Sequence, residues 1–192
     1  EFSDGLAVVT KNGRDYFFID KTGKRISGES YDHADRFTDG IAAVEKDNKF
    51  FFIDKNGEKI SGKEYDYTYG FSEGLAAVEK DGVYFYIDEK GKEAFNERYD
   101  HAGNFYEGLA VVKENGKSFF IDKTGRKISD ERYDHAGSFM DGRAMVAKGP
   151  EQFYIDKTGK RIIDKKEGGK NSRPALKDVI SSFEEKAEKP AK

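Results

Sequence analysis

The side chains best equipped to bind a ligand lie in a short stretch where tyrosine precedes aspartate and, in three of four copies, histidine follows. A phenol ring offers apolar area, and carboxylate and imidazole groups offer hydrogen bonds, a combination enriched at binding hot spots. We therefore predict an exposed binding surface there. In the alternative, each tyrosine packs a linker and each aspartate caps a turn. The residues are Tyr31, Asp32, His33, Tyr65, Asp66, Tyr99, Asp100, His101, Tyr133, Asp134 and His135.

The histidines of this stretch do not predict a metal site. They occupy equivalent positions in the sequence, and Tyr67 takes the place of histidine in the remaining copy. Zinc requires its ligands to converge within about 2.1 Å, whereas equivalent side chains on stacked units normally lie too far apart. We predict neither a metal nor a cofactor.

A second polar set consists of acidic residues that each precede a repeated glycine. If the repeated units stack in register, these carboxylates form a row. The row is either solvated and hydrogen-bonded locally, or it binds divalent cations or a cationic partner. The residues are Asp4, Asp39, Glu73, Glu107 and Asp141.

Two short motifs resemble catalytic ones but lack the context that catalysis needs. The Asp-Lys-Thr-Gly sequence at 20–23 resembles the phosphorylated-aspartate motif of P-type ATPases, yet it occurs three times and the required threonine does not follow. Residues 70–74 fit the nucleophile elbow, whose serine lies between a strand and a helix, but a strand is expected after Ser72. We predict turns at both places and a protein that is not an enzyme.

The composition excludes several classes of protein. Lys and Arg number 34 against 37 Asp and Glu, which gives a net charge of -3 and disfavours nucleic-acid binding through phosphates. No apolar run is long enough for membrane insertion, and the absence of cysteine excludes disulfides and thiolate chemistry. Sixteen Phe and eleven Tyr can build a core from few side chains.

The elements that carry these residues belong to a repeat with a period of 34 residues. An Ile-Asp pair recurs five times with a glycine three residues later, and the Tyr-Asp pair recurs between the units. We therefore predict a repeat domain of five units at 1–164, followed by a distinct segment at 165–192. The Ile-Asp pairs begin at Ile19, Ile53, Ile87, Ile121 and Ile155, and the glycines are Gly23, Gly57, Gly91, Gly125 and Gly159.

Each unit is predicted to contain three strands. In the third unit, the runs at 75–78 and 83–87 flank a turn and indicate a hairpin, and a weaker third strand is expected at 92–95. The second strand is aromatic on both faces, as is typical of a strand covered on both, so we predict that it is central in the unit. The glycine after each Ile-Asp should have positive φ because it closes a tight turn.

The unit resembles the WG (KWG) repeat of bacterial surface and secreted proteins in three features. These are Phe71-x-Glu-Gly-Leu75-Ala-x-Val, the aromatic residue before Ile87-Asp-x-x-Gly-Lys, and Tyr99-Asp100. The chain departs from that repeat because it has no Trp, and phenylalanine stands where the family has the glycine of Trp-Gly. The resemblance implies a repeat protein with interaction functions, often outside the cytoplasm, and it supplies no catalytic residues.

The tail at 165–192 begins with charged and glycine residues and continues with apolar residues at helical spacing from Ala175 to Phe183. It predicts an amphipathic helix that caps the last unit, or that docks a partner. The sequence begins with Glu1 and Phe2, with neither an initiator methionine nor the basic and apolar regions of a secretion signal. This start is expected of a processed or trimmed chain. We expect it to act outside the cytoplasm.

The predicted fold is all-β: an open, twisted array of five three-stranded units with a C-terminal capping helix. A closed five-bladed β-propeller is the alternative. The predicted function is a non-catalytic scaffold that binds a protein or peptide through a repetitive surface. Carbohydrate or cell-wall binding and a structural fibre or assembly subunit that self-associates are the alternatives.

Overall fold

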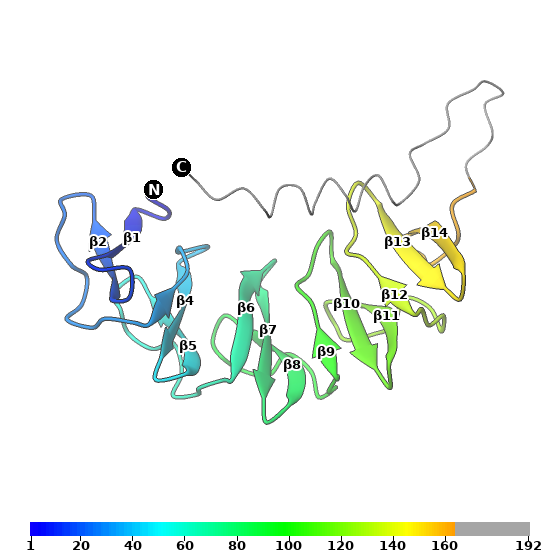
Figure 1. Cartoon of the computed structure of the whole chain (residues 1–192), viewed down its shortest axis with the longest axis horizontal. Helices are drawn as coiled ribbons and strands as arrows, with labels where there is room; N and C mark the ends of the chain where they lie inside the picture. The colour runs from blue at the N-terminus through cyan, green and yellow to red at the C-terminus, as the bar shows by residue number, and fades with distance from the viewer. Residues whose placement is uncertain (164–192) are drawn as a thin grey trace, which may run out of the picture. The chain divides into compact units, whose positions relative to one another are not determined.

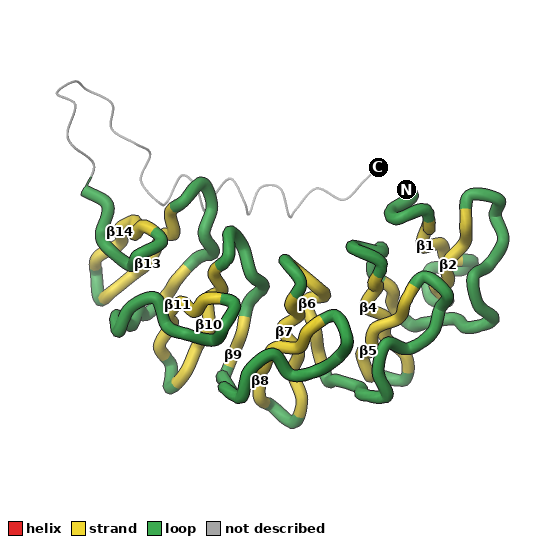
Figure 2. The backbone as a smooth tube through the Cα atoms, turned by 180° about the vertical axis from the view of Figure 1, so that it is seen from behind, coloured by secondary structure: helices red, strands yellow, loops and turns green. Residues whose placement is uncertain are grey.

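A computed structural model describes residues 1–163, and Figure 2 shows strands and connecting loops throughout this part of the chain. The described part contains no helix that could cross a membrane. One compact unit runs from Glu1 to Ile162. The helix predicted within 165–192 lies outside the described residues.

The strands form five separate antiparallel sheets, which follow one another in chain order along an open arc (Figure 1). The first sheet has two strands, and each of the other four has three. The strands of the first three sheets are β1 (Leu6–Thr10) and β2 (Tyr16–Asp20); β3 (His33–Ala34), β4 (Ile41–Lys46) and β5 (Lys49–Asp54); β6 (Tyr67–Ser72), β7 (Leu75–Lys80) and β8 (Val83–Asp88). The last two sheets contain β9 (His101–Ala102), β10 (Leu109–Glu114) and β11 (Lys117–Asp122); β12 (His135–Ala136), β13 (Arg143–Lys148) and β14 (Glu151–Asp156). The all-β class and the open arrangement are confirmed.

The prediction for the third strand was wrong. Residues 92–95 contribute only an isolated bridge between Ile87 and Glu93, because the chain pairs briefly after the turn and then leaves the sheet. The third strand instead precedes the hairpin and comes from the Tyr-Asp-His stretch. The strand order β3-β4-β5 consequently places the first hairpin strand, rather than the aromatic second one, in the middle of the sheet.

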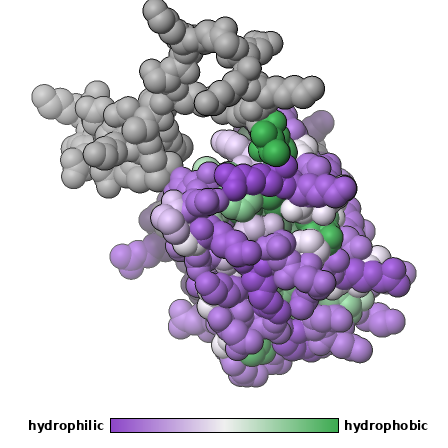
Figure 3. Space-filling view, turned by 90° about the vertical axis from the view of Figure 1, so that its right-hand side faces the viewer, coloured by the Kyte–Doolittle hydropathy of each residue, from purple (hydrophilic) through white to green (hydrophobic). Residues whose placement is uncertain are grey.

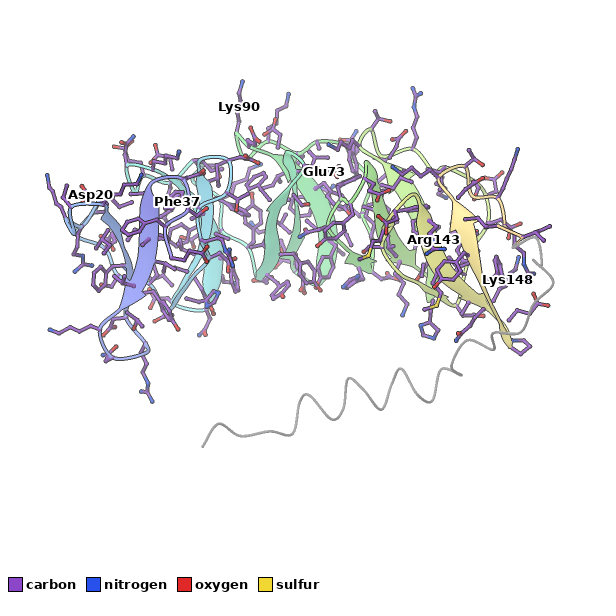
Figure 4. All side chains as sticks on the ribbon, turned by 90° about the horizontal axis from the view of Figure 1, so that it is seen from above. Asp20, Phe37, Glu73, Lys90, Arg143 and Lys148 are labelled. Carbon is purple, nitrogen blue, oxygen red and sulfur yellow. The ribbon has the colours of Figure 1, made fainter. Side chains whose placement is uncertain are left out.

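The aromatic second strand is nevertheless covered on both faces, as its sequence predicts. Phe51 of β5 packs in the core shared with the first sheet, a cluster that also contains Phe18 of β2. The next residue, Phe52, points to the opposite face and packs with the third sheet. Figure 4 shows Phe37, which is also buried between the first two sheets, in the interior of this row of sheets. Each junction between sheets therefore holds its own hydrophobic core, and the sheets stabilise one another as a stack.

Tight turns allow the sheets to approach closely. The glycine after each Ile-Asp has positive φ, between 73° and 85°, which confirms the prediction. At Gly57 an added Cβ would lie 2.8 Å from the Cβ of Ser27, and at Gly125 it would lie 2.9 Å from the ring of Phe95. Both neighbours belong to the preceding unit. These glycines thus serve the turn and the contact between units together.

Candidate functional site

The four tyrosines predicted to form a binding surface are buried. Tyr31, Tyr65, Tyr99 and Tyr133 are 3%, 1%, 5% and 2% exposed. Each ring lies between aromatic rings of two consecutive sheets; the ring centroid of Tyr31 is 6.2 Å from that of Phe18 and 6.1 Å from that of Phe51. Burial raises the pKa of these phenols, to about 12 at Tyr99. A binding surface requires exposed rings, so these tyrosines are structural.

The four aspartates that follow them are structural as well. The carboxylate of Asp66 accepts a hydrogen bond of 2.8 Å from the backbone amide of Asp81, at the tip of the β7–β8 hairpin. Asp32, Asp100 and Asp134 accept the equivalent bond from the next hairpin tip. The prediction that Tyr and Asp of this stretch form the site was therefore wrong. The stretch carries the chain from one sheet to the next, and its polar groups anchor the hairpin turns.

The three histidines of the stretch are exposed. Nε2 of His33 lies 3.2 Å from a carboxylate oxygen of Asp35. Nε2 of His101 lies 3.1 Å from the hydroxyl of Tyr69. These histidines are therefore accessible to a ligand, whereas the tyrosines of the stretch are not.

Three of the five acidic residues before the repeated glycines tie neighbouring units together. Asp4 accepts a hydrogen bond from the amide of Gly40, one unit further along the chain. Glu73 and Glu107 do the same with Gly108 and Gly142, and each carboxylate also meets a lysine. We call this arrangement the clasp. Of the two alternatives for the acidic row, the clasp corresponds to carboxylates that are hydrogen-bonded locally, because its bonds join consecutive units.

The two catalytic-looking motifs are turns. The carboxylate of Asp20 accepts bonds from the amides of Thr22 and Lys24 and from the hydroxyl of Thr22, which close the turn after β2. The hydroxyl of Ser72 donates to the carbonyl of Phe105 in the next unit, at 2.7 Å. The Asp20 carboxylate therefore stabilises a turn, and the Ser72 hydroxyl joins two units.

Two equivalent hollows lie at the first and last junctions between sheets, with volumes of about 360 and 480 Å³. In the first hollow, Lys46 is paired with Glu29 at 2.6 Å and Lys59 with Glu64 at 2.7 Å. Lys49 is paired with Asp66. The walls of this hollow therefore carry charges that already neutralise one another, and Lys59 covers the ring of Phe51.

A row of side chains that crosses several sheets forms the best candidate site. Within one sheet, His33 lies opposite Glu45 and Glu45 opposite Phe50. In the next sheet, Tyr67, Glu79 and Tyr84 occupy the same positions. Directly opposite residues share a face of the sheet and are close neighbours. The row is thus built from rings with one carboxylate between them in each of these two sheets.

Ring contacts continue the row from sheet to sheet. The centroids of Tyr16 and His33 are 5.8 Å apart, those of Phe50 and Tyr67 are 5.7 Å apart, and those of Tyr84 and His101 are 5.1 Å apart. We call this set, together with Tyr69, the aromatic row. Its members are Tyr16, His33, Phe50, Tyr67, Tyr69, Tyr84 and His101.

Two exposed tyrosines of the aromatic row come from β6, which has six residues where β3, β9 and β12 have two. A bulge follows Thr68, whose buried hydroxyl donates to the carbonyl of Ala77. The positive φ of Gly70, 78°, permits this bend. Tyr67 and Tyr69 then lie 37% and 43% exposed, with their ring centroids 4.9 Å apart.

The sequence contains a signal for this site, namely two positions at which the third unit differs from the other copies of the repeat. Tyr69 stands where the other copies have Asp35, Gly103 and Gly137, and Tyr67 stands where they have histidine. A hollow of about 270 Å³ adjoins Tyr69 and is lined by residues of the second and third units, among them Arg36 and Phe71. The third unit departs from the repeat where its surface is most aromatic.

Comparison with known proteins supports the repeat. A family model described as "WG containing repeat" matches residues 16–50, 50–84, 84–117 and 119–149. No curated protein sequence matches the chain. Among solved structures, Hsv2 of Kluyveromyces marxianus is similar with a TM-score of 0.52 at 9% identity, over 84% of this chain and 59% of that one. Hsv2 of Kluyveromyces lactis gives 0.51 at 10% identity, over 85% of this chain and 60% of that one. Identities this low show a likeness of fold alone.

Proposed function

Because the chain belongs to the family of WG-containing repeats, we propose that it is a non-catalytic interaction scaffold whose aromatic row binds a protein or peptide partner. The observation that carries this proposal is that the rings of Tyr67 and Tyr69 are exposed side by side, whereas most rings that recur in the repeat pack its sheets. Tyrosine is enriched at binding hot spots because its ring desolvates a large area while its hydroxyl keeps a hydrogen bond. The proposed location outside the cytoplasm rests on the family resemblance.

Several features of the row favour a macromolecular ligand. The row extends over parts of four sheets, and its rings come from β2, β3, β5, β6, β8 and β9. A partner lying along it would make several weak contacts at once, and linked contacts raise the overall affinity. The hollow beside Tyr69 would give one side chain of the partner a place to insert.

Binding of carbohydrate or cell wall is the second candidate, since aromatic rings beside carboxylates also suit a sugar. It differs from the first candidate in its ligand and uses the same surface. An array of immobilised glycans distinguishes the two: binding that survives high salt and depends on Tyr67 and Tyr69 would favour the sugar. Self-association is tested by sizing the chain over a range of concentrations, because a fibre or assembly subunit would remain large on dilution.

The experiment that tests the first candidate introduces a photo-crosslinking residue in place of Tyr69 and, as a matched control, in place of Tyr106. Both tyrosines are exposed, at 43% and 47%, but Tyr106 has no ring neighbour in the row. We expect a defined crosslinked partner from the Tyr69 position only, and we expect it to disappear when Tyr67 is changed to alanine. Equal crosslinking from both positions would contradict the proposal.

A further inference from the structure

Many carboxylates on this surface pair with a cation, whereas two in the aromatic row do not. Most acidic side chains near the junctions pair with lysine or arginine, as Glu131 does with Lys148 at 2.7 Å, or accept backbone amides. Glu45 and Glu79 have no cationic partner within 4.0 Å among residues 1–163. Both are half-buried, so each has given up part of its hydration without a charge in exchange.

Rings surround these two carboxylates. Glu79 lies opposite Tyr67 on one side and Tyr84 on the other, and the ring of His101 contacts the ring of Tyr84. Burial first, and then the Glu79 carboxylate, raise the pKa of the Tyr84 hydroxyl. Burial, Tyr69 and Asp35 raise the pKa of Tyr67 in the same direction. The carboxylates of Glu79 and Asp35 therefore place negative charge beside these two rings.

The chemistry that complements this arrangement is a cation on an apolar stem. The face of an aromatic ring carries negative charge density and attracts Lys and Arg side chains, more strongly when the site is partly desolvated. A carboxylate in the same site adds Coulomb attraction and a hydrogen-bond acceptor. The aliphatic part of Lys or Arg can pack on the rings while its head reaches the carboxylate.

We infer that the aromatic row recognises a basic segment of a partner protein, with one Lys or Arg side chain held by Glu79, Tyr67 and Tyr84. Glu45, between His33 and Phe50, forms a second, weaker position one sheet away. This inference rests on the proposed function, since it specifies the chemistry of the partner that binds the aromatic row. The fourth sheet has Lys113 in the equivalent position, and this lysine marks the limit of the acidic part of the row.

The experiment titrates the full chain with short synthetic peptides that differ in one residue: lysine, arginine, norleucine or citrulline. Norleucine and citrulline retain most of the stem and remove the charge. NMR signals of the rings of Tyr67, Tyr69 and Tyr84 report binding at this site. We expect the charged peptides to bind, and E79Q to weaken their binding about fivefold, the upper end of what an exposed ion pair contributes. The control E58Q, which removes an exposed carboxylate outside the row, should leave their affinity unchanged.

Each result has a separate meaning. If norleucine and citrulline peptides shift the same ring signals with equal affinity, or if E79Q binds the charged peptides like the wild type, the inference is overturned and the aromatic row still binds peptide. If no peptide shifts these signals, the proposed function fails together with it. Circular dichroism of E79Q checks that its fold is retained, because glutamine preserves the shape of the side chain.

Discussion

Tyr65 and Tyr67 are two residues apart, yet they belong to different regions of the molecule. Tyr65 is 1% exposed and lies in the core between the second and third sheets. Tyr67 is 37% exposed and lies in the aromatic row. Tyr65 recurs in every copy of its stretch, whereas Tyr67 replaces a histidine. The residues that pack the junctions recur in the repeat, whereas the two exposed tyrosines of the candidate site, Tyr67 and Tyr69, depart from it.

This contrast follows from the physics of a stacked repeat. Every sheet must cover the next, so a residue that packs the junction is needed in each unit. A ligand needs a distinct surface only where it binds. In Figure 3, the side of the molecule that carries β13 and β14 is mostly hydrophilic, with small separate hydrophobic spots. The last sheet also departs from the repeat. Arginine replaces an apolar residue there: Arg143 takes the position of Leu6, Ile41, Leu75 and Leu109. Its guanidinium lies 5.0 Å from the ring centroid of Tyr154.

The largest expected effect is at a junction. Phe85 is 6% exposed, and its ring packs against Tyr65 at 6.1 Å between centroids. We expect F85A to lower the free energy of unfolding by about 3–5 kcal/mol, as buried large-to-small changes do. Y69A, in the aromatic row, should cost less than about 0.5 kcal/mol. Urea denaturation followed by circular dichroism measures both, and equal losses would abolish the distinction between the two regions.

The next effect separates the turn from the contact between units. Gly23 and Gly125 have φ of 85° and 82°, so alanine is strained at either position, by about 1 kcal/mol. Around Gly23 there is open space, whereas a Cβ at Gly125 would meet the ring of Phe95. We expect G125A to cost about 1–3 kcal/mol more than G23A. Thermal unfolding of the two variants gives the comparison. Identical midpoints would show that the ring of Phe95 moves aside without loss of stability.

A third effect depends on pH and concerns the aspartates that anchor the hairpins. The bond from Lys49, followed by that from the Asp81 amide, lowers the pKa of Asp66. A carboxylate whose pKa is lowered by folding stabilises the protein above its unfolded pKa of about 3.9. This contribution is lost as the pH falls through the lower folded value.

We therefore expect D66N to be less stable than the wild type at pH 7, and the difference to shrink as the pH approaches 3. Asn can still accept the turn amide, so the change isolates the ion pair. D32N is the control, since Asp32 accepts the same amide bond without a lysine partner within 4.0 Å among the described residues. Melting temperatures at several pH values provide the test, and a difference that grows toward acid would refute the assignment.

Much of the fold could be predicted from the sequence because the repeat is expressed in residues with strong local preferences. The Asp-x-x-Gly turns, the hairpins and the double-sided aromatic strand all follow from the period of 34 residues. The third strand could not be predicted, because two residues such as His33 and Ala34 carry no periodicity. The tyrosines were misplaced for a related reason: Tyr beside Asp has the composition of a hot spot, and only the packing of Phe18 and Phe51 around Tyr31 decides otherwise.

The smallest effect concerns one junction at which the clasp is missing. Asp39 occupies the acidic position between the second and third units, but the amide of Gly74 donates no bond to its carboxylate, whereas the amide of Gly40 donates one to Asp4. Glu89 stands beside Gly74 where Lys55 stands beside Gly40. This junction therefore has acidic residues at both positions, where the other clasps have a carboxylate and a lysine.

We expect E89K to complete this clasp and to raise the free energy of unfolding by about 0.5 kcal/mol, the usual scale of an exposed ion pair. D130K makes the same change of charge at an exposed residue away from the clasps and should have less effect. The gain from E89K should disappear in the double variant D39N/E89K, because the lysine then lacks its partner, and it should fall in high salt. A gain of equal size in both backgrounds would mean that removing Glu89, rather than pairing with Asp39, stabilises the junction.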